Sequence, residues 1–423
     1  MQKLRMAQVG CGGMGLRHLH GQAELQRVFG SVDLVAVCDR NISTAEHVAS
    51  EAEKMLGTRP AVYSDFDELL DKEPELDGVD IVTEVGSHHT LAAKAFDAGV
   101  HVAMEKPLGL TVKACHQIIE AAERSGCVLS VSENYRRDPM NLLVKALIDS
   151  GSLGQPRLMI DVSTRGSEYM PHSTAWRHIK LRGGALLDYG VHDADMFMFL
   201  MGEPERIYAE TDLFQRTRKT GDAAMNERMR QMYAHRVADD TERGETIETS
   251  SEDVALASVR FKSGALGTFV HSLAAPGKSG AMEVLYCSEG SINLPGARTG
   301  NPVKVTRIDQ SRALSKADVL ALVPDFELDD LTATFFGGSR LSSYDLPFGQ
   351  SDAKLIALEL QDLVNAVTTG SDVAVPGKLG LDAVALVYSI LESGQAQMPV
   401  AFADVVNGDV ADYQQEIDDH AGL

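Results

Sequence analysis

A glycine-rich loop between a predicted strand and a predicted helix constrains the fold of this chain more than any other feature. Residues 6–9 are an apolar strand candidate, and residues 10–15 (Gly-Cys-Gly-Gly-Met-Gly) follow it and open a helical pattern. This G-x-G-x-x-G arrangement is typical of dinucleotide-binding folds, because its glycines allow a tight turn and a close approach of the backbone to a pyrophosphate. The pyrophosphate lies at the helix N-terminus, where unpaired N–H groups attract it. The expected contacts are Gly10, Gly12, Gly13, Met14 and Gly15.

An acidic residue after the next strand supports this interpretation. Residues 34–38 form the second strand candidate, and Asp39 follows them at the place where a carboxylate binds the ribose hydroxyls of the adenosine half. A carboxylate there repels a 2′-phosphate, so we expect NAD rather than NADP as the cofactor. Arg40 leaves the alternative open, because its guanidinium can stack on the adenine or bind a 2′-phosphate.

Length and charge narrow the class of protein. The chain has 423 residues, 44% of them hydrophobic, which is enough for two domains with full cores. A formal charge of −22 argues against binding to nucleic acid or to an anionic membrane. No apolar run approaches the roughly 20 residues of a membrane span, and the first strand begins close to Met1, so we expect a cytoplasmic protein without a signal peptide. The five cysteines form no C-x-x-C pair, and no Cys/His cluster is present, so we expect no metal site.

The first third of the chain alternates short β-branched runs with helical patterns, which predicts the doubly wound parallel sheet of a Rossmann domain. Ligands bind beyond the carboxyl ends of such strands, where Gly10, Asp39, Thr83 and the Glu105-Lys106-Pro107 segment fall. The strands are expected at residues 6–9, 34–38, 80–83, 101–104 and 127–132, and the helices at 14–28, 43–56, 65–71, 88–98 and 111–125.

The pattern changes after Pro139, where strand candidates follow one another with tight turns and predict an α+β domain with an open, mostly antiparallel sheet. We therefore expect a dinucleotide-binding domain over residues 1–136 and a substrate-binding and oligomerisation domain over residues 137–423. Its helices are expected at about 140–150 and 184–201, and its strands at 156–164, 254–261, 266–272, 282–286 and 291–294.

A charged segment, residues 215–251, interrupts this second domain. Its centre, residues 225–235, could form a helix, and the rest is too polar to bury. This composition predicts a solvated surface insertion, with a lid or a subunit contact as the alternative.

Several motifs give the chain a resemblance to a known family. They are Asp80-Ile-Val-Thr83 with His88, the Glu105-Lys106-Pro107 motif, the Asn134-Tyr-Arg-Arg-Asp-Pro139 segment, Trp176-Arg177, and Asp188-x-x-x-His192 after two glycines. Together they make the chain, from about residue 4 to 400, similar to the Gfo/Idh/MocA family of glucose-fructose oxidoreductase and inositol dehydrogenase type. The resemblance implies NAD(P)-dependent oxidation or reduction of a secondary hydroxyl on a sugar, cyclitol or related polyol. It also implies a homo-oligomer, a dimer or a tetramer.

The resemblance makes Lys106 the active-site lysine, with a cis bond before Pro107, His192 the acid/base residue and Asp188 the acid beside it. General chemistry agrees, because a hydroxyl that loses hydride must also lose a proton, and histidine titrates near neutral pH. Lys106 near an oxidised nicotinamide is expected to lose its proton and to hydrogen-bond the developing alkoxide. Asp188 and His192 are four residues apart on a predicted helix, so the carboxylate can fix the imidazole tautomer or bind a neighbouring hydroxyl.

Other residues are expected to line the two halves of the site. On the cofactor side these are Thr83, His88, Glu105 and Asn134, and His88 could instead cap its helix. On the substrate side these are Tyr135, Arg136, Trp176 and Arg177. The chain departs from the family at Glu84-Val85, where Pro-Asn is usual, which puts the geometry of that loop in doubt.

A basic run before the predicted catalytic helix bears on the substrate. Arg177, Lys180 and Arg182 could clamp an acidic group on a sugar, or they could be ordinary surface charges. The leading interpretation is a sugar or polyol dehydrogenase or reductase. The alternative is a redox-neutral glycosidase that oxidises, eliminates and re-reduces its substrate on bound NAD. Lys106, Asp188 and His192 weigh against a third reading, a non-enzymatic nucleotide sensor.

Overall fold

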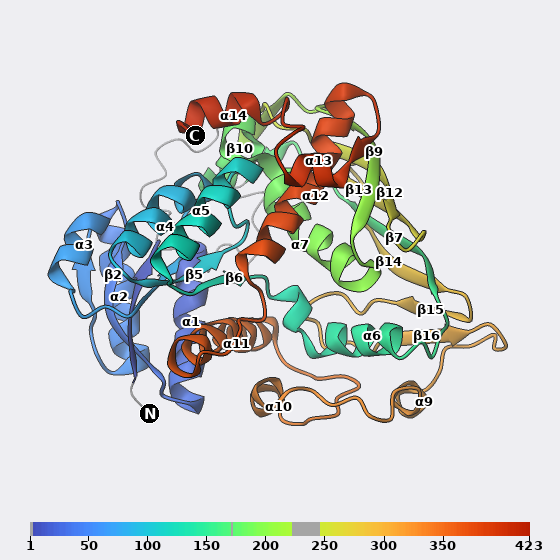
Figure 1. Cartoon of the computed structure of the whole chain (residues 1–423), viewed down its shortest axis with the longest axis horizontal. Coiled ribbons are helices and arrows are strands. Elements are labelled where there is room, and N and C mark those ends of the chain that lie inside the picture. Colours follow the sequence, from blue (N-terminus) through green and yellow to red (C-terminus); the bar gives the residue numbers. More distant parts are fainter. Residues whose placement is uncertain (1–2, 171, 222–245) are drawn as a thin grey trace.

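The first part of the chain forms a six-stranded parallel sheet with helices on both faces (Figure 1). The computed structural model describes residues 3–170, 172–221 and 246–423. The strand order is β3-β2-β1-β4-β5-β6, as in a doubly wound fold. The elements are β1 (Leu4–Val9), α1 (Gly13–Val28), β2 (Val32–Cys38), α2 (Ile42–Leu56), β3 (Ala61–Tyr63), α3 (Phe66–Lys72), β4 (Gly78–Ile81), η1 (Val85–Ser87), α4 (His88–Asp97), β5 (His101–Glu105), α5 (Val112–Ser125) and β6 (Leu129–Ser132).

The predicted Rossmann domain is therefore confirmed, with one strand missed. The missing strand, β3, has only three residues, lies at the edge of the sheet and is half-exposed, so it lacks the apolar run that marks its neighbours. Every residue is buried in β4, inside the sheet, and in β6, at the edge opposite β3, which is expected where helices cover both faces of a parallel sheet.

The second part of the chain builds an eight-stranded mixed sheet in the order β16-β15-β14-β7-β13-β12-β9-β17. Only the β7 and β13 pair is parallel among its described pairs, so the prediction of a mostly antiparallel sheet is confirmed. Helices α7 and α12 lie against one face of it (Figure 1). The elements are η2 (Tyr135–Arg137), α6 (Pro139–Asp149), β7 (Pro156–Thr164), β8 (Tyr169–Met170), η3 (His172–His178), η4 (Lys180–Arg182), α7 (Gly184–Met201), β9 (Pro204–Asp212), β10 (Thr217–Thr220), β11 (Thr246–Glu248), β12 (Val254–Phe261), β13 (Leu266–Ser272), β14 (Gly280–Cys287), β15 (Gly290–Asn293), β16 (Lys304–Arg307), α9 (Lys316–Ala321), α10 (Asp330–Phe336), α11 (Phe348–Thr369), α12 (Gly377–Ala396), β17 (Val400–Ala401), α13 (Phe402–Val406) and α14 (Gln415–Ala421).

The charged segment at residues 215–251 is not simply a solvated insertion. The helix expected at residues 225–235 lies outside the described residues, but the ends of the segment form β10 and β11, which join β8 in a small sheet. Arg218 on β10 is only 3% exposed, and its guanidinium pairs with Asp253 at 3.1 Å. The expectation that this part is too polar to bury is therefore wrong at Arg218, because a paired guanidinium can be buried.

Helix α11 returns from the second part of the chain to the first, where it packs against α1 and reaches β5 and β6 (Figure 1). Lys354 of α11 pairs with Glu24 of α1 at 2.7 Å, and Asp352 accepts hydrogen bonds from Arg17. The boundary between residues 136 and 137 stays a prediction, since α11 contributes to the core around the first sheet.

Candidate active site

The glycine loop after β1 has no room for a side chain at Gly10 or Gly15. Gly10 has a φ of +101°, and a Cβ atom there would lie 2.6 Å from the carbonyl oxygen of Val82. A Cβ atom on Gly15 would lie 2.2 Å from the carbonyl oxygen of Gly10. Gly12 caps α1 and Gly13 begins it. At its glycines the turn thus has no side chain between the backbone and a bound phosphate, which the close approach of a phosphate requires.

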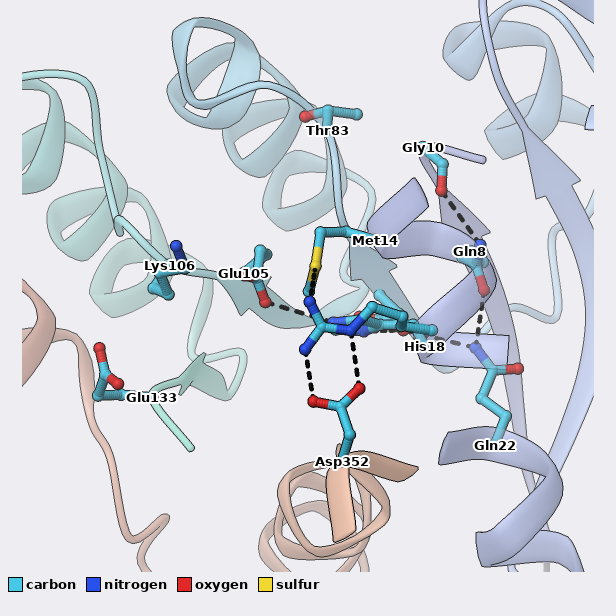
Figure 2. Close-up of polar contacts among 12 residues, drawn as sticks. Gln8, Gly10, Met14, His18, Gln22, Thr83, Glu105, Lys106, Glu133 and Asp352 are labelled. Atoms are coloured by element: carbon cyan, nitrogen blue, oxygen red, sulfur yellow. Dashed lines mark hydrogen bonds and ion pairs between the residues drawn. The ribbon is translucent and has the colours of Figure 1, made fainter. Parts of the chain in front are cut away.

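Asp39 lies beside this loop at the end of β2. Its Oδ2 accepts the backbone N–H of Cys11 at 2.8 Å, and its Oδ1 accepts that of Asn41 at 2.9 Å. Two backbone donors therefore hold the carboxylate next to the glycine loop. Arg40 is exposed, and Met14 accepts a hydrogen bond on its sulfur from Arg17 at 2.7 Å (Figure 2).

Lys106 and Asp188 meet where the two parts of the chain face each other. The Lys106 Nζ donates to the backbone oxygen of Asp188 at 2.8 Å and to its Oδ1 at 3.3 Å, and the Lys106–Pro107 bond is cis as expected. Arg177 Nε lies 2.6 Å from Asp188 Oδ2. Burial opposes the charge of Lys106, but Asp188 and Glu105 outweigh it and raise its pKa. The protein's own charges thus favour the ammonium form of Lys106, and its loss of a proton beside an oxidised nicotinamide stays a prediction.

His192 is paired with a carboxylate that the sequence did not single out. Its Nδ1 contacts Glu133, which directly follows β6, and the ring of Tyr135 stacks on the imidazole with centroids 4.1 Å apart and planes 3° apart. Asp188 instead faces Lys106 and Arg177, so the expectation that it fixes the imidazole tautomer is wrong. Helical spacing places both residues on one face but does not decide which partner each one meets across the domain boundary.

Burial sets the protonation of this pair. Burial, followed by the positive charges of Lys106 and Arg298, lowers the pKa of His192 well below its usual range, although Glu105 and Asp188 act against this. Burial also raises the pKa of Glu133 to about 7. When Nδ1–H donates to the Glu133 carboxylate, the Nε2 lone pair of a neutral His192 is left to accept a proton.

A second buried histidine joins helix α1 to two strands of the first sheet (Figure 2). His18 of α1 is fully buried, and its Nδ1 lies 3.0 Å from Asp80 of β4, while its Nε2 lies 3.3 Å from Glu105 of β5. Burial opposes its charge, but the two carboxylates raise the pKa of His18 well above its usual value. Glu105 is thereby fixed at the end of β5, next to Lys106.

Thr83, His88 and Asn134 were expected on the cofactor side, and the structure gives each of them a different environment. Thr83 Oγ1 lies 2.7 Å from Ser87 Oγ. His88 is fully buried, with its ring between the carbonyl oxygens of Pro107 (3.0 Å) and Thr83 (3.3 Å), so it holds two loops together rather than capping its helix. Asn134 is 4% exposed, and its Oδ1 has no hydrogen-bond partner among the described residues.

Two of the predicted substrate contacts are occupied by other interactions. Arg136 donates to both carboxylate oxygens of Asp195, at 2.8 and 2.6 Å, and lies over the ring of Phe199. Trp176 is half-buried with the Arg177 guanidinium 5.1 Å from its ring centroid. Arg136 is therefore paired with α7, and its role as a substrate contact stays a prediction.

The basic run before α7 is likewise matched by carboxylates from elsewhere in the chain. Arg177 pairs with Asp188, Lys180 with Glu416 at 3.1 Å, and Arg182 with Glu84. The last pair explains the departure from Pro-Asn after Thr83, because Glu84 links the first sheet to the segment that precedes α7.

Three residues that sequence reasoning missed belong to this site. Glu133 follows a strand of the parallel sheet, as Glu105 ends one, and this position could have marked it. His18 lies three residues after Gly15 on a helix whose buried face could have included it. Arg298 lies in the loop after β15, far from any motif, and carries no local signal.

Comparisons with known proteins agree with this architecture. Residues 4–133 match the oxidoreductase family with an NAD-binding Rossmann fold, and residues 142–293 match the GFO/IDH/MocA C-terminal domain. The chain is 29% identical to a D-apiose dehydrogenase from Paraburkholderia graminis, over 50% of this chain and 53% of that protein. It is 27% identical to the myo-inositol 2-dehydrogenase of Thermotoga maritima, over 64% of this chain and 68% of that protein. It is also 27% identical to an alpha-N-acetylgalactosaminidase from Shewanella oneidensis, over 47% of this chain and 45% of that protein.

A solved structure resembles the whole molecule. The NAD-binding oxidoreductase from Klebsiella pneumoniae superposes with a TM-score of 0.74 at 26% identity, covering 95% of this chain and 99% of that one. Within the described residues, no helix combines the length and apolar character needed to cross a bilayer, and no three His, Cys, Asp or Glu side chains are grouped to hold a metal ion.

Proposed function

Because this chain belongs to the GFO/IDH/MocA family of oxidoreductases, we propose that it oxidises a secondary hydroxyl of a sugar, cyclitol or glycoside with NAD as the hydride acceptor. One observation carries the proposal. A buried His192 backed by Glu133 lies in the same site as a half-buried Lys106 held by Asp188, beside the carboxyl ends of β5 and β6. A base and a cation in that arrangement suit the removal of a proton from a hydroxyl group.

The residues present fit a dinucleotide. Gly10, Gly12, Gly13 and Gly15 leave room for the pyrophosphate, and Asp39 is held beside them for the ribose hydroxyls. Asp39 favours NAD over NADP by repelling a 2′-phosphate. The unpartnered Oδ1 of Asn134 is a buried acceptor that a bound nicotinamide amide could satisfy. When bound, NAD accepts a hydride from the carbinol carbon.

The chain's own residues then handle the proton. His192 Nε2 accepts the hydroxyl proton, and Glu133 stabilises the resulting imidazolium through Nδ1–H. Lys106 donates a hydrogen bond to the developing alkoxide, where a charged donor is strongest. Asp188, whose pKa is held low by Arg177 and Lys106 despite its burial, orients Lys106.

The paired state of the basic run bears on the substrate. Since Arg177, Lys180 and Arg182 each have a protein carboxylate as partner, we favour a neutral polyol over an acidic sugar. An acidic substrate would have to displace Asp188, Glu416 or Glu84 from a cation.

A panel of neutral sugars, inositols and uronic acids, monitored for NADH absorbance with NAD and with NADP, tests the proposal. We expect turnover of at least one neutral polyol with NAD and weaker binding of NADP. If none of the polyols gives NADH, the dehydrogenase proposal is wrong. A clear preference for NADP would make Arg40 the ligand of a 2′-phosphate.

The match to the alpha-N-acetylgalactosaminidase favours a second candidate, a glycosidase that uses NAD without net redox change. The same His192 would accept the hydroxyl proton in the oxidation step. Release of an aglycone from aryl glycosides without accumulation of NADH would support this candidate over the dehydrogenase.

We also propose that the protein is a homo-oligomer that pairs through the second sheet. Register places Leu256, Leu266, Met282 and Tyr286 on the face of the sheet opposite to Phe269, which packs on Phe197 of α7. These four side chains are each more than 40% exposed, so the face away from the helices presents several large apolar side chains to solvent.

A further inference from the structure

The loop between β15 and β16 carries Arg298 toward the active site. The backbone of Arg298 has a φ of 63°, a left-handed conformation that is uncommon for a residue with a side chain. Its N–H donates to Asp138 Oδ2 at 2.7 Å, and the Tyr344 hydroxyl donates to the same oxygen at 2.8 Å. These contacts overdetermine a strained turn, which is typical of functional positions.

The Arg298 side chain contacts Tyr135, the residue whose ring stacks on His192. Its guanidinium lies 5.0 Å from the centroid of the Tyr135 ring, and its Nη2 donates to the Tyr135 hydroxyl at 3.3 Å. The ring of Tyr135 also stacks on that of His192, with centroids 4.1 Å apart. Tyr135 therefore contacts both the Arg298 guanidinium and the His192 imidazole.

The charge of Arg298 is only partly offset in this position. Its Nη1 lies 3.1 Å from Asp352 Oδ1, but Asp352 also accepts hydrogen bonds from Arg17 (Figure 2). Its Nε is buried and has no hydrogen-bond partner among the described residues.

We propose that Arg298 is a positioning residue for His192, which it acts on through the Tyr135 ring to keep the imidazole stacked and neutral, ready to accept a proton from the substrate. This inference rests on the proposed function of His192 as the base. An arginine this far along the chain, in the second sheet's loop, would thus complete a site otherwise made by β5, β6 and α7.

The charged groups around His192 determine whether removal of the Arg298 charge raises or lowers the pKa of His192. Glu133 follows β6, Glu105 and Lys106 lie at the end of β5, and Asp188 is on α7, while Tyr135 contacts both the imidazole and Arg298. After burial, Lys106 and Arg298 lower the pKa of His192, and Glu105 and Asp188 raise it. Removing the Arg298 charge must therefore raise the pKa of His192.

Histidine titration by NMR tests this without any substrate. The full-length protein is labelled with ¹³C-histidine, and the His192 signal is assigned by its loss in His192→Gln. We expect the His192 midpoint to rise by on the order of one pH unit in Arg298→Gln and to stay near that of wild type in Arg298→Lys. An unchanged midpoint in Arg298→Gln, or an equal rise in both variants, would overturn the proposal.

Asp352→Asn is the matched control, because it breaks the same anchor to α11 while keeping the cation. The proposal predicts no rise of the His192 midpoint in Asp352→Asn. This variant can be measured even if Arg298→Gln fails to fold. A rise in Asp352→Asn would mean that Arg298 only holds its loop in place and does not act on His192 through its charge. Since the titration needs no turnover, a wild-type protein that oxidises no polyol would refute the proposed function and leave this test intact.

Discussion

At the scale of single residues, the arrangement of the site depends on which carboxylate pairs with which basic side chain. Spacing in the sequence identified His192, Lys106 and Asp188 but paired Asp188 with His192, because helical periodicity describes one helix only. In the fold, Asp188 meets Lys106 and Arg177 across the domain boundary, and His192 meets Glu133, which lies 59 residues away in the chain. Contacts between elements that are distant in sequence leave no local pattern, and Arg298 is the extreme case.

The Glu133 and His192 pair gives the first prediction. Glu133→Gln keeps the shape and a hydrogen-bond acceptor but removes the charge that stabilises an imidazolium. We expect kcat to fall about 10- to 100-fold with NAD affinity unchanged. Steady-state kinetics and NAD titration measure the two quantities, and a kcat within twofold of wild type would reduce Glu133 to a packing role.

The buried His18 gives a prediction about stability and pH. Its pKa is raised in the folded protein, so its contribution is complete below the unfolded pKa of about 6.5 and is lost as the pH rises through the folded value. His18→Gln leaves Asp80 and Glu105 without their cation and should lower the free energy of unfolding by about 3 kcal/mol at pH 6.5.

Urea unfolding of both proteins between pH 6.5 and 9 checks this prediction. The difference in unfolding free energy between wild type and His18→Gln should shrink as the pH rises. A difference that stays constant over this range would mean that His18 is neutral in the folded protein.

At the scale of elements, the pattern of the sequence predicted the strands well wherever they alternate or are fully apolar. Residues 156–164, 254–261 and 266–272 form strands with the predicted bounds, and α7 spans 184–201 as expected. The long helices α11 and α12 had no predicted counterpart, because they are buried on several sides and show no clear polar face. Arg218 was misjudged because its partner, Asp253, comes from another segment.

The join between β1 and α1 gives an element-scale prediction. A Cβ on Gly15 would clash with the backbone at Gly10, so Gly15→Ala should weaken NAD binding at least tenfold and lower the melting temperature. Gly349→Ala is the matched control, since a Cβ there meets nothing within 4 Å and its φ is not positive. Isothermal titration and thermal unfolding measure both variants, and normal NAD affinity in Gly15→Ala would argue against this loop as the pyrophosphate site.

At the scale of the whole molecule, the first and second parts of the chain meet at the boundary where Lys106 contacts Asp188. Lys106 with Asp188 and Glu84 with Arg182 are ion pairs between the first sheet and the segments around α7, and α11 ties the second part of the chain to α1. The sequence predicted both sheets. It did not predict that α11 packs against α1 beside the first sheet, because this packing leaves no motif in the sequence.

The exposed apolar side chains on the second sheet (Leu256, Leu266, Met282 and Tyr286) give a prediction about assembly. Leu256→Lys should convert the proposed oligomer to a smaller species, because a charge in an apolar interface loses its hydration. Met398→Lys is the control, as Met398 is 61% exposed in the loop after α12. Light scattering measures the mass of each variant. A wild-type monomer, or an unchanged mass in Leu256→Lys, would contradict this interface.

The proposed function requires His192 to remove the proton from a substrate hydroxyl and to take no part in NAD binding, which we assign to the glycine loop, Asp39 and Asn134. On a substrate found with the panel, kcat and the NAD dissociation constant are measured for wild type and His192→Gln. We expect kcat to fall by about 100- to 10,000-fold while the NAD dissociation constant changes less than about twofold. A kcat within tenfold of wild type would contradict the role of His192 as the base. A loss of NAD binding in His192→Gln would contradict it as well.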